Sequence, residues 1–254
     1  MALLEIRDLT KTFSGLTAVD NVTMDVFEFE LLGLIGPNGA GKTTLFNLIS
    51  GYFRPTRGRI TFNDEDVTGL RADEIACRGI ARTFQASTLF MQKTLFDNVF
   101  TGFHLSCKQA GWKALFHTAG ANEEEAAIKE GVMEILDFMG LTDLGNELCV
   151  NLPHGHQRTA GICIGLATRP KLLLLDEPMT GMNPQETLHL MGLVKKIRDR
   201  GITIVIVEHD MKAIMGLCDR IVVLNYGKKI AEGLPQDIKE NKEVIEAYLG
   251  REED

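Results

Sequence analysis

One short stretch constrains the fold of this chain more than any other. The sequence GPNGAGKTT, from Gly36 to Thr44, matches the pattern G-x-x-x-x-G-K-S/T in full. An apolar run, LLGLI, precedes it, and a segment with a helical pattern follows at residues 43–52. A strand, a glycine-rich loop and a helix in this order direct successive backbone N–H groups at an anion. The sequence therefore predicts a phosphate-binding loop inside an α/β fold.

The side chains of the loop indicate a nucleotide. Lys42 is placed to reach the β- and γ-phosphates, and the hydroxyl of Thr43 is placed to hold Mg²⁺. A chance glycine-rich turn is the alternative, but the strand and helix patterns on either side count against it. The predicted nucleotide-binding residues of the loop are Gly36, Pro37, Asn38, Gly39, Ala40, Gly41, Lys42, Thr43 and Thr44.

Two further apolar runs end in side chains that suit nucleotide hydrolysis. The run LLLLDEP reaches Asp176 and Glu177, and the run TIVIVEHD reaches Glu208, His209 and Asp210. Parallel strands deliver such groups to the carboxyl edge of an α/β sheet, where ligands bind. Asp176 suits Mg²⁺, directly or through water. Glu177 suits the polarisation of a water, and His209 is placed to contact the same γ-phosphate.

A shorter strand pattern, IARTFQ, ends at Gln85. Glutamine offers a neutral oxygen that can bind Mg²⁺ and can move with whatever the following segment touches. On its own, Gln85 is also an ordinary polar loop residue.

Strand and helix patterns alternate on both sides of a helical insert. Residues 3–9 alternate apolar and polar, residues 22–36 form one β-branched and apolar run, and residues 58–64 indicate a strand that ends in a turn. From about 92 to 165 the chain is first irregular and polar, and then helical. Apolar runs typical of buried parallel strands follow. We predict a single domain over 1–254, with a core from 1–91 and 166–254 and a helical subdomain at about 92–165.

Composition excludes several classes of protein. The formal net charge of −8 disfavours nucleic acid as a partner, because phosphate neutralisation needs clustered Lys and Arg. No apolar run approaches the roughly 20 residues of a membrane span, so a role at a membrane requires a protein partner. The five cysteines form no C-x-x-C pair and are expected to be free thiols, as in a reducing cytosol.

With these elements in order, the chain resembles the ATP-binding subunits of ABC transporters over nearly all its length. The resemblance implies a P-loop NTPase of the ABC-ATPase fold, with a parallel-sheet core, an antiparallel β portion and an inserted helical subdomain. ATP and Mg²⁺ are the implied ligands, and ATP hydrolysis is the implied activity. The implied catalytic residues are Lys42, Glu177 (the catalytic carboxylate) and His209 (the switch histidine). The implied metal residues are Thr43, Gln85 (the Q-loop glutamine) and Asp176 (the end of Walker B).

Two more positions follow from the resemblance. Phe13, in LTKTFSG, falls where the family places an aromatic ring that stacks on adenine, although a Phe at the edge of the core would look the same. Phe29, in FEFE, stands where relatives carry a turn glycine.

The stretch NLPHGHQ, residues 151–157, lies where the family carries its signature, usually L-S-G-G-Q. Leu152 and Gly155 are kept, while Pro153, His154 and His156 replace the other three residues. The resemblance implies that Leu152, Gly155 and His156 open a helix whose N–H groups face ATP held by a second ATPase chain. A zinc site is the alternative, but no C-x-x-C or H-x-x-x-H completes the three or four ligands that it needs.

Within the family, the chain is most similar to ATPases of branched-chain amino acid importers of the LivG type. The similarity rests on ARTFQASTLFMQKTLFDNV, on the insert at about 103–127 and on the tail VIEAYLG. It implies a second ABC ATPase, identical or different, and permease subunits that dock in a groove near Gln85. It also implies an indirect role for a substrate-binding protein and a peripheral place on the cytoplasmic face of the membrane.

Three alternatives stay open at this point. The ATPase of another ABC transporter, such as a lipopolysaccharide exporter, shares the YLG-type tail. A GTPase switch is suggested by DVTG at 66–69, but NKEV from 241 breaks the guanine-reading pattern N-K-x-D. Soluble ABC proteins of DNA repair or translation carry tandem cassettes, long coiled coils or zinc modules, which this sequence does not show.

Overall fold

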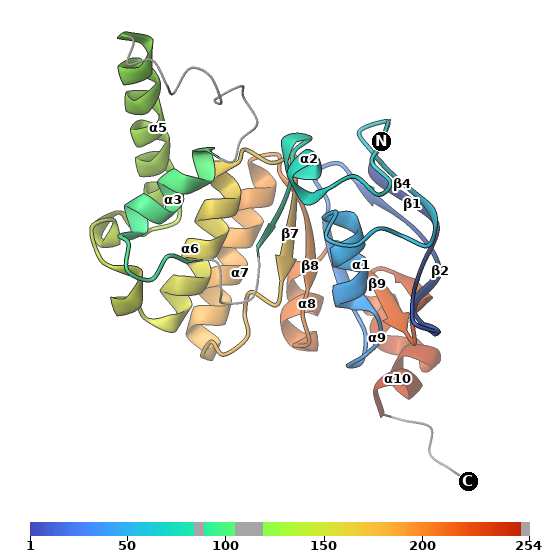
Figure 1. Ribbon diagram of the computed structural model, residues 1–254. Helices are drawn as coiled ribbons and strands as arrows, with labels where there is room; N and C mark the ends of the chain where they lie inside the picture. The colour runs from blue at the N-terminus through green and yellow to red at the C-terminus, as the bar shows by residue number, and fades with distance from the viewer. Residues whose placement is uncertain (84–88, 105–118, 250–254) are drawn as a thin grey trace.

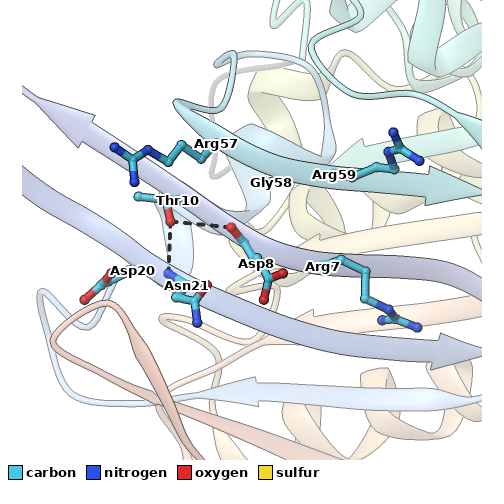
Figure 2. A pocket seen from close by; sticks show the side chains of 8 residues that line it. All are labelled: Arg7, Asp8, Thr10, Asp20, Asn21, Arg57, Gly58 and Arg59. Carbon is cyan, nitrogen blue, oxygen red and sulfur yellow. Dashed lines mark hydrogen bonds between the residues drawn. The ribbon is translucent and has the colours of Figure 1, made fainter.

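The computed structural model describes residues 1–83, 89–104 and 119–249, which form two β-sheets with helices around them (Figure 1). The strands are β1 (Ala2–Phe13), β2 (Leu16–Phe27), β3 (Leu31–Ile35), β4 (Arg57–Phe62), β5 (Glu65–Asp66), β6 (Ile80–Thr83), β7 (Leu172–Asp176), β8 (Thr203–Val207), β9 (Arg220–Asn225) and β10 (Lys228–Gly233). The α-helices are α1 (Lys42–Ile49), α2 (Ala72–Cys77), α3 (Leu95–His104), α5 (Ala119–Phe138), α6 (His154–Ala167), α7 (Pro184–Asp199), α8 (Met211–Leu217), α9 (Pro235–Glu240) and α10 (Lys242–Leu249).

The larger sheet has six strands in the order β10-β9-β3-β8-β7-β6. Strands β9, β3, β8, β7 and β6 run parallel, and β10 is antiparallel to β9. The smaller sheet is antiparallel, in the order β2-β1-β4-β5. These two sheets are the parallel core and the antiparallel portion that the family resemblance implies.

Both faces of the larger sheet are buried, which explains its continuous apolar runs. Leu32 and Leu34 pack on one side, with α1 and the antiparallel sheet. Leu31 and Ile35 pack on the other side, with α6, α7 and α8. Successive residues of a strand point to opposite faces, so β3 contributes to both hydrophobic clusters. The same alternation fixes which side chains of the neighbouring strands face α1.

The predicted run at 22–36 is two strands rather than one. β2 belongs to the antiparallel sheet and β3 to the parallel sheet, and residues 28–30 turn between them. Phe29 adopts φ 62° in this turn, a left-handed conformation that favours glycine. Its N–H donates to Thr203 Oγ1 at 2.9 Å, which ties the turn to β8. Apolar and acidic residues alternate through this turn as they would in a strand, and this pattern concealed the break.

The helices between β6 and β7 pack on the face of the sheet that also carries α7 and α8. At Gly102 of α3, a Cβ atom would lie 2.7 Å from the Ala167 side chain, so α3 and α6 approach closely. At Gly165 of α6, a Cβ would meet the Leu173 side chain at 3.1 Å. Part of the insert, 105–118, lies outside the described residues, and the subdomain boundaries near 92 and 165 stay a prediction.

The cysteines only partly match expectation. Cys149, Cys163 and Cys218 are free and buried. Cys77 is bonded in a disulfide, so the expectation of a free thiol is wrong there, and Cys107 lies outside the described residues. Among the described helices, none has the length and apolar character needed to cross a membrane.

Candidate active site

The glycine-rich loop connects β3 to α1, as the sequence predicts. Gly36, Gly39 and Gly41 have φ values of 151°, 80° and 99°. A Cβ at Gly36 would lie 2.1 Å from the carbonyl oxygen of Leu224, and one at Gly41 would lie 2.4 Å from that of Ala18. These two positions therefore admit only glycine. The N-terminus of α1 has no side-chain cap, which leaves its first N–H groups for a ligand.

Lys42 is the first residue of α1 and is only 8% exposed. Its ammonium group donates to the carbonyl oxygens of Gly36 at 2.6 Å and Pro37 at 3.0 Å. Burial lowers the pKa of Lys42, while the charges of Glu177 and Asp176 act to raise it. The ammonium group of Lys42 therefore interacts electrostatically with the carboxylates of both Asp176 and Glu177. Thr43 follows in the first turn of α1 and is exposed.

The end of β7 supplies the carboxylates. Asp176 is 6% exposed, and its Oδ2 accepts a hydrogen bond from Arg82 Nη2 at 2.8 Å. Glu177 has φ 47°, an uncommon value for a residue other than glycine. Its N–H donates to the carbonyl of Val207 at 2.9 Å, so the backbone is held against the end of β8. Strain at a position that is fixed in this way is typical of functional sites.

The end of β8 contributes a second buried acid. Glu208 is 1% exposed and accepts hydrogen bonds from the N–H groups of Met179 at 2.7 Å and His209 at 3.3 Å. Burial raises the pKa of Glu208, and the charge of Glu177 adds to this effect, whereas the two amide bonds and His209 lower it. The imidazole Nδ1 of His209 lies 3.8 Å from Glu208 Oε2, and this side chain is 60% exposed. Glu208 therefore joins the segment after β7 to the segment that carries His209.

Phe13 ends β1 and lies in a small aromatic group. Its ring packs edge to face on Phe53, with 5.2 Å between ring centroids, and Lys11 Nζ lies 4.9 Å from the Phe13 centroid. Phe13 remains 37% exposed, so part of its surface is accessible. Neither Phe53 nor Lys11 is marked out by the sequence.

The signature residues lie apart from the loop of the same chain. Leu152 is buried, and His156 is exposed near the start of α6. Figure 1 shows α6 and α1 on different sides of β7, in agreement with their separate hydrophobic clusters. At Gly155, a Cβ would lie 3.0 Å from Glu186 Oε1, and at Gly181 a Cβ would lie 3.2 Å from His154 Cε1. The signature turn thus packs on the start of α7 and the segment before it.

Gln85 lies outside the described residues, so its predicted position is not tested. β6, which leads toward it, ends at Thr83, paired with Leu175 of β7. In the described ranges, no group of three or more His, Cys, Asp and Glu side chains has the arrangement of a metal site. Thr43 and Asp176 provide hard oxygen donors, which is the chemistry that Mg²⁺ prefers. Sequence reasoning missed Arg82 and assigned no role to Glu208.

Comparison with known families and proteins gives a consistent result. A family model described as "ABC transporter" matches residues 19–180, and a model described as "Branched-chain amino acid ATP-binding cassette transporter" matches residues 228–254. The high-affinity branched-chain amino acid transport ATP-binding protein LivG of Salmonella typhimurium is 40% identical over 249 residues, which are 98% of each chain.

Two further similarities are informative. The lipopolysaccharide export system ATP-binding protein LptB of Acidithiobacillus ferridurans is 33% identical over 98% of this chain and 97% of its own. Among solved structures, the ADP conformation of an ATP-binding cassette from an ABC transporter has a TM-score of 0.87 and 29% identity, covering 99% of this chain and all of the other.

Proposed function

The chain belongs to the ABC transporter family of ATP-binding proteins, and we propose from this premise that it is the ATP-hydrolysing motor subunit of a branched-chain amino acid importer. One observation carries the catalytic part of the proposal. The Gly36–Thr44 loop follows β3, and Asp176 and Glu177 lie at the end of β7, so the loop and both carboxylates share the carboxyl edge of one parallel sheet. The charges of Glu177 and Asp176 act there to raise the pKa of Lys42. Other elements of the fold add the residues that complete the site.

Two comparisons favour the importer over a lipopolysaccharide exporter. Identity to the importer protein LivG is 40%, against 33% to the exporter protein LptB. The branched-chain amino acid model also matches the C-terminal segment, residues 228–254. The exporter ATPase remains the second candidate because its relative covers nearly the same length of this chain.

Nucleotide binding begins at the loop. The N–H groups at the start of α1 and of the loop surround the phosphates, with the positive end of the helix dipole behind them. Lys42 exchanges its bonds to the carbonyls of Gly36 and Pro37 for phosphate oxygens, which carry full negative charge. The accessible part of Phe13 packs on the adenine ring, supported from one side by Phe53.

Thr43, Asp176 and Gln85 are the residues that would hold Mg²⁺. When bound, Mg²⁺ neutralises charge on the phosphate oxygens. Asp176 offers Oδ1 for this purpose, since Oδ2 is bonded to Arg82.

Glu177 acts on the attacking water. Its carboxylate accepts a hydrogen bond from that water and takes its proton as the oxygen attacks the γ-phosphorus. The bond from the γ-phosphorus to the β–γ bridging oxygen breaks, and ADP leaves with the electron pair. The bond from the Glu177 N–H to Val207 holds the residue in place without using the side chain. His209, exposed at the end of β8, is free to contact the γ-phosphate.

The site is completed by a second ATPase chain, identical or different. The signature turn has Leu152 before α6 and Gly155 and His156 in the first turn of this helix. It faces ATP bound to the partner, because the loop of the same chain lies on the other side of β7. The permease subunits dock in a groove near Gln85, and a substrate-binding protein delivers solute to them. Through these contacts the chain is held peripherally at the cytoplasmic face of the membrane.

Solute uptake in the native host tests this proposal. Replacing the chromosomal copy with a Glu177→Gln allele is expected to abolish uptake of labelled leucine, isoleucine and valine, while uptake of a basic amino acid persists as the control. Normal leucine uptake, together with a change in surface lipopolysaccharide, would support the exporter instead.

A further inference from the structure

A buried arginine connects the elements that carry the proposed metal residues. Arg82 lies in β6, opposite Leu174 of the parallel neighbour β7. Its side chain is only 6% exposed. A guanidinium group that is buried to this extent normally has a charged partner. None of the roles assigned above includes this residue.

The guanidinium group spans the space between β7 and α1. Nη2 donates to Asp176 Oδ2 at 2.8 Å. Nη1 donates to Asn47 Oδ1 at 2.6 Å and to Ser50 Oγ at 3.2 Å, both on the α1 side. The ring of Phe46 lies 5.7 Å from the guanidinium carbon. The planar group with donors on two edges suits this double attachment, which an ammonium group cannot reproduce.

Strand alternation explains why these side chains meet. In β6, Ile80 packs on the α1 side of the sheet and Ala81 on the other, so Arg82 returns to the α1 side. In β7, Leu172 and Leu174 pack on that side too, so Asp176 faces it at the end of the strand. Two charged side chains on adjacent strands are therefore directed at the same helix.

Both members of the ion pair between Arg82 and Asp176 are buried. Arg82 and Asp176 are each 6% exposed. Removal of one partner from such a pair is strongly destabilising, because the other charge is left buried and unpaired. The pair therefore fixes the carboxylate of Asp176 firmly, with Oδ1 left for another partner.

We propose that Arg82 is a positioning residue for Mg²⁺ in nucleotide binding. It joins the two elements that carry Thr43 (α1) and Asp176 (β7). Its bonds set the distance between α1 and the end of β7 and hold Asp176 in the orientation that metal binding needs. This inference rests on the proposed function, because it assumes that the site takes Mg²⁺ with ATP.

The charge of Arg82 and its role in orienting Asp176 have opposite effects on Mg²⁺ affinity. A cation beside Asp176 disfavours Mg²⁺ by repulsion, so a residue that contributed only charge would tighten metal binding when removed. A residue that orients a metal ligand weakens metal binding when changed, typically about ten- to a hundredfold. Arg82→Lys keeps the charge but loses the double attachment, and Arg82→Met loses both.

The test is equilibrium binding of a fluorescent ATP analogue to the purified full-length chain, with excess Mg²⁺ and with a chelator. The dissociation constant with the chelator, divided by the dissociation constant with Mg²⁺, measures the contribution of the metal to binding. Both Arg82 variants are expected to reduce this ratio about ten- to a hundredfold. Metal-free binding should change by less than about twofold, because no phosphate contact is lost. Binding of Mn²⁺ in the presence of ADP, followed by electron paramagnetic resonance, should weaken in parallel.

Two further variants keep the test decisive. Asn47→Ala removes the shorter of the two Nη1 bonds on the α1 side and leaves the buried pair intact, so it should fold and still reduce the ratio about threefold or more. Arg78→Met is the matched control, because Arg78 forms an exposed ion pair with Glu65 at 3.2 Å and should leave the ratio unchanged.

The outcomes are distinguishable. An unchanged or larger ratio in folded Arg82→Lys, or an unchanged ratio in Asn47→Ala, would overturn the positioning role. A wild-type chain that binds the analogue equally well with and without Mg²⁺ would overturn the proposed metal site itself.

Discussion

The ammonium group of Lys42 lies 2.6 Å from the carbonyl oxygen of Gly36, so this side chain closes back on the loop from which it starts. The contact keeps the charge next to the space that the loop encloses. Lys42→Ala should therefore weaken ATP binding by about 1.5–3 kcal/mol, the usual value of a hydrogen bond to a charged group. Isothermal titration of the purified chain measures this loss. The exposed Lys196→Ala variant serves as the control, and equal affinities in all three proteins would refute the loop assignment.

Glu177→Gln should keep ATP binding and lose turnover by about a hundred- to ten-thousandfold, because only the proton acceptor is removed. Its backbone bond to Val207 does not involve the side chain, so the variant is expected to fold normally. Phosphate release and nucleotide affinity are measured on the same preparation. A folded variant that no longer bound ATP, or that hydrolysed it at the wild-type rate, would contradict the role of Glu177.

Glu208 should make stability depend on pH. Because burial raises the pKa of Glu208, the folded chain binds this proton more tightly than the unfolded chain does. The resulting stabilisation is complete below the ordinary pKa of 4.5 and is lost as the pH rises through the higher folded value. Glu208→Gln keeps an acceptor for Met179 but does not titrate.

Urea unfolding near pH 5 and near pH 8 measures this effect. The wild type should gain stability relative to Glu208→Gln at the lower pH. Both proteins are best compared in a His209→Gln background, which removes the titration of the neighbouring imidazole. The acidic neighbour Glu177 is the same in both. A stability difference that stays constant with pH would show that Glu208 has an ordinary environment.

Phe29→Gly should stabilise the fold by roughly 0.5–1 kcal/mol, because the residue has φ 62° and a left-handed conformation costs other residues about 1–2 kcal/mol. The ring is 60% exposed, so little burial is lost. Phe29→Ala loses the same ring without gaining the freedom of glycine and should give no increase. Chemical denaturation of the three proteins decides between them; equal stability of the Gly and Ala variants would exclude strain at this turn.

Local sequence patterns were sufficient to predict the strand, loop and helix around Gly36–Thr44, because neighbouring residues specify each of these parts. The break between β2 and β3 was not predictable in the same way. Apolar and acidic residues keep alternating through Glu28 and Glu30, and Phe29 occupies a turn position where glycine would have marked the break.

The role of Arg82 was missed for a different reason. Its partners Asn47 and Asp176 are 35 and 94 positions away in the sequence, and only the packing of β6, β7 and α1 brings them together. The same is true of Phe13 and Phe53, which are separated in the sequence by β2, β3 and α1. Contacts between distant segments of this kind leave no periodic pattern in either segment.

The central claim is that this chain hydrolyses ATP at sites shared between two ATPase chains. The most direct measurement is the rate of phosphate release per chain over a wide range of chain concentrations, with Mg²⁺ and saturating ATP, for the wild type and for Glu177→Gln. The rate per chain is expected to be low in dilute solution, to rise with concentration and to be abolished in the variant. A rate per chain that is independent of concentration, or that survives Glu177→Gln, would contradict this claim.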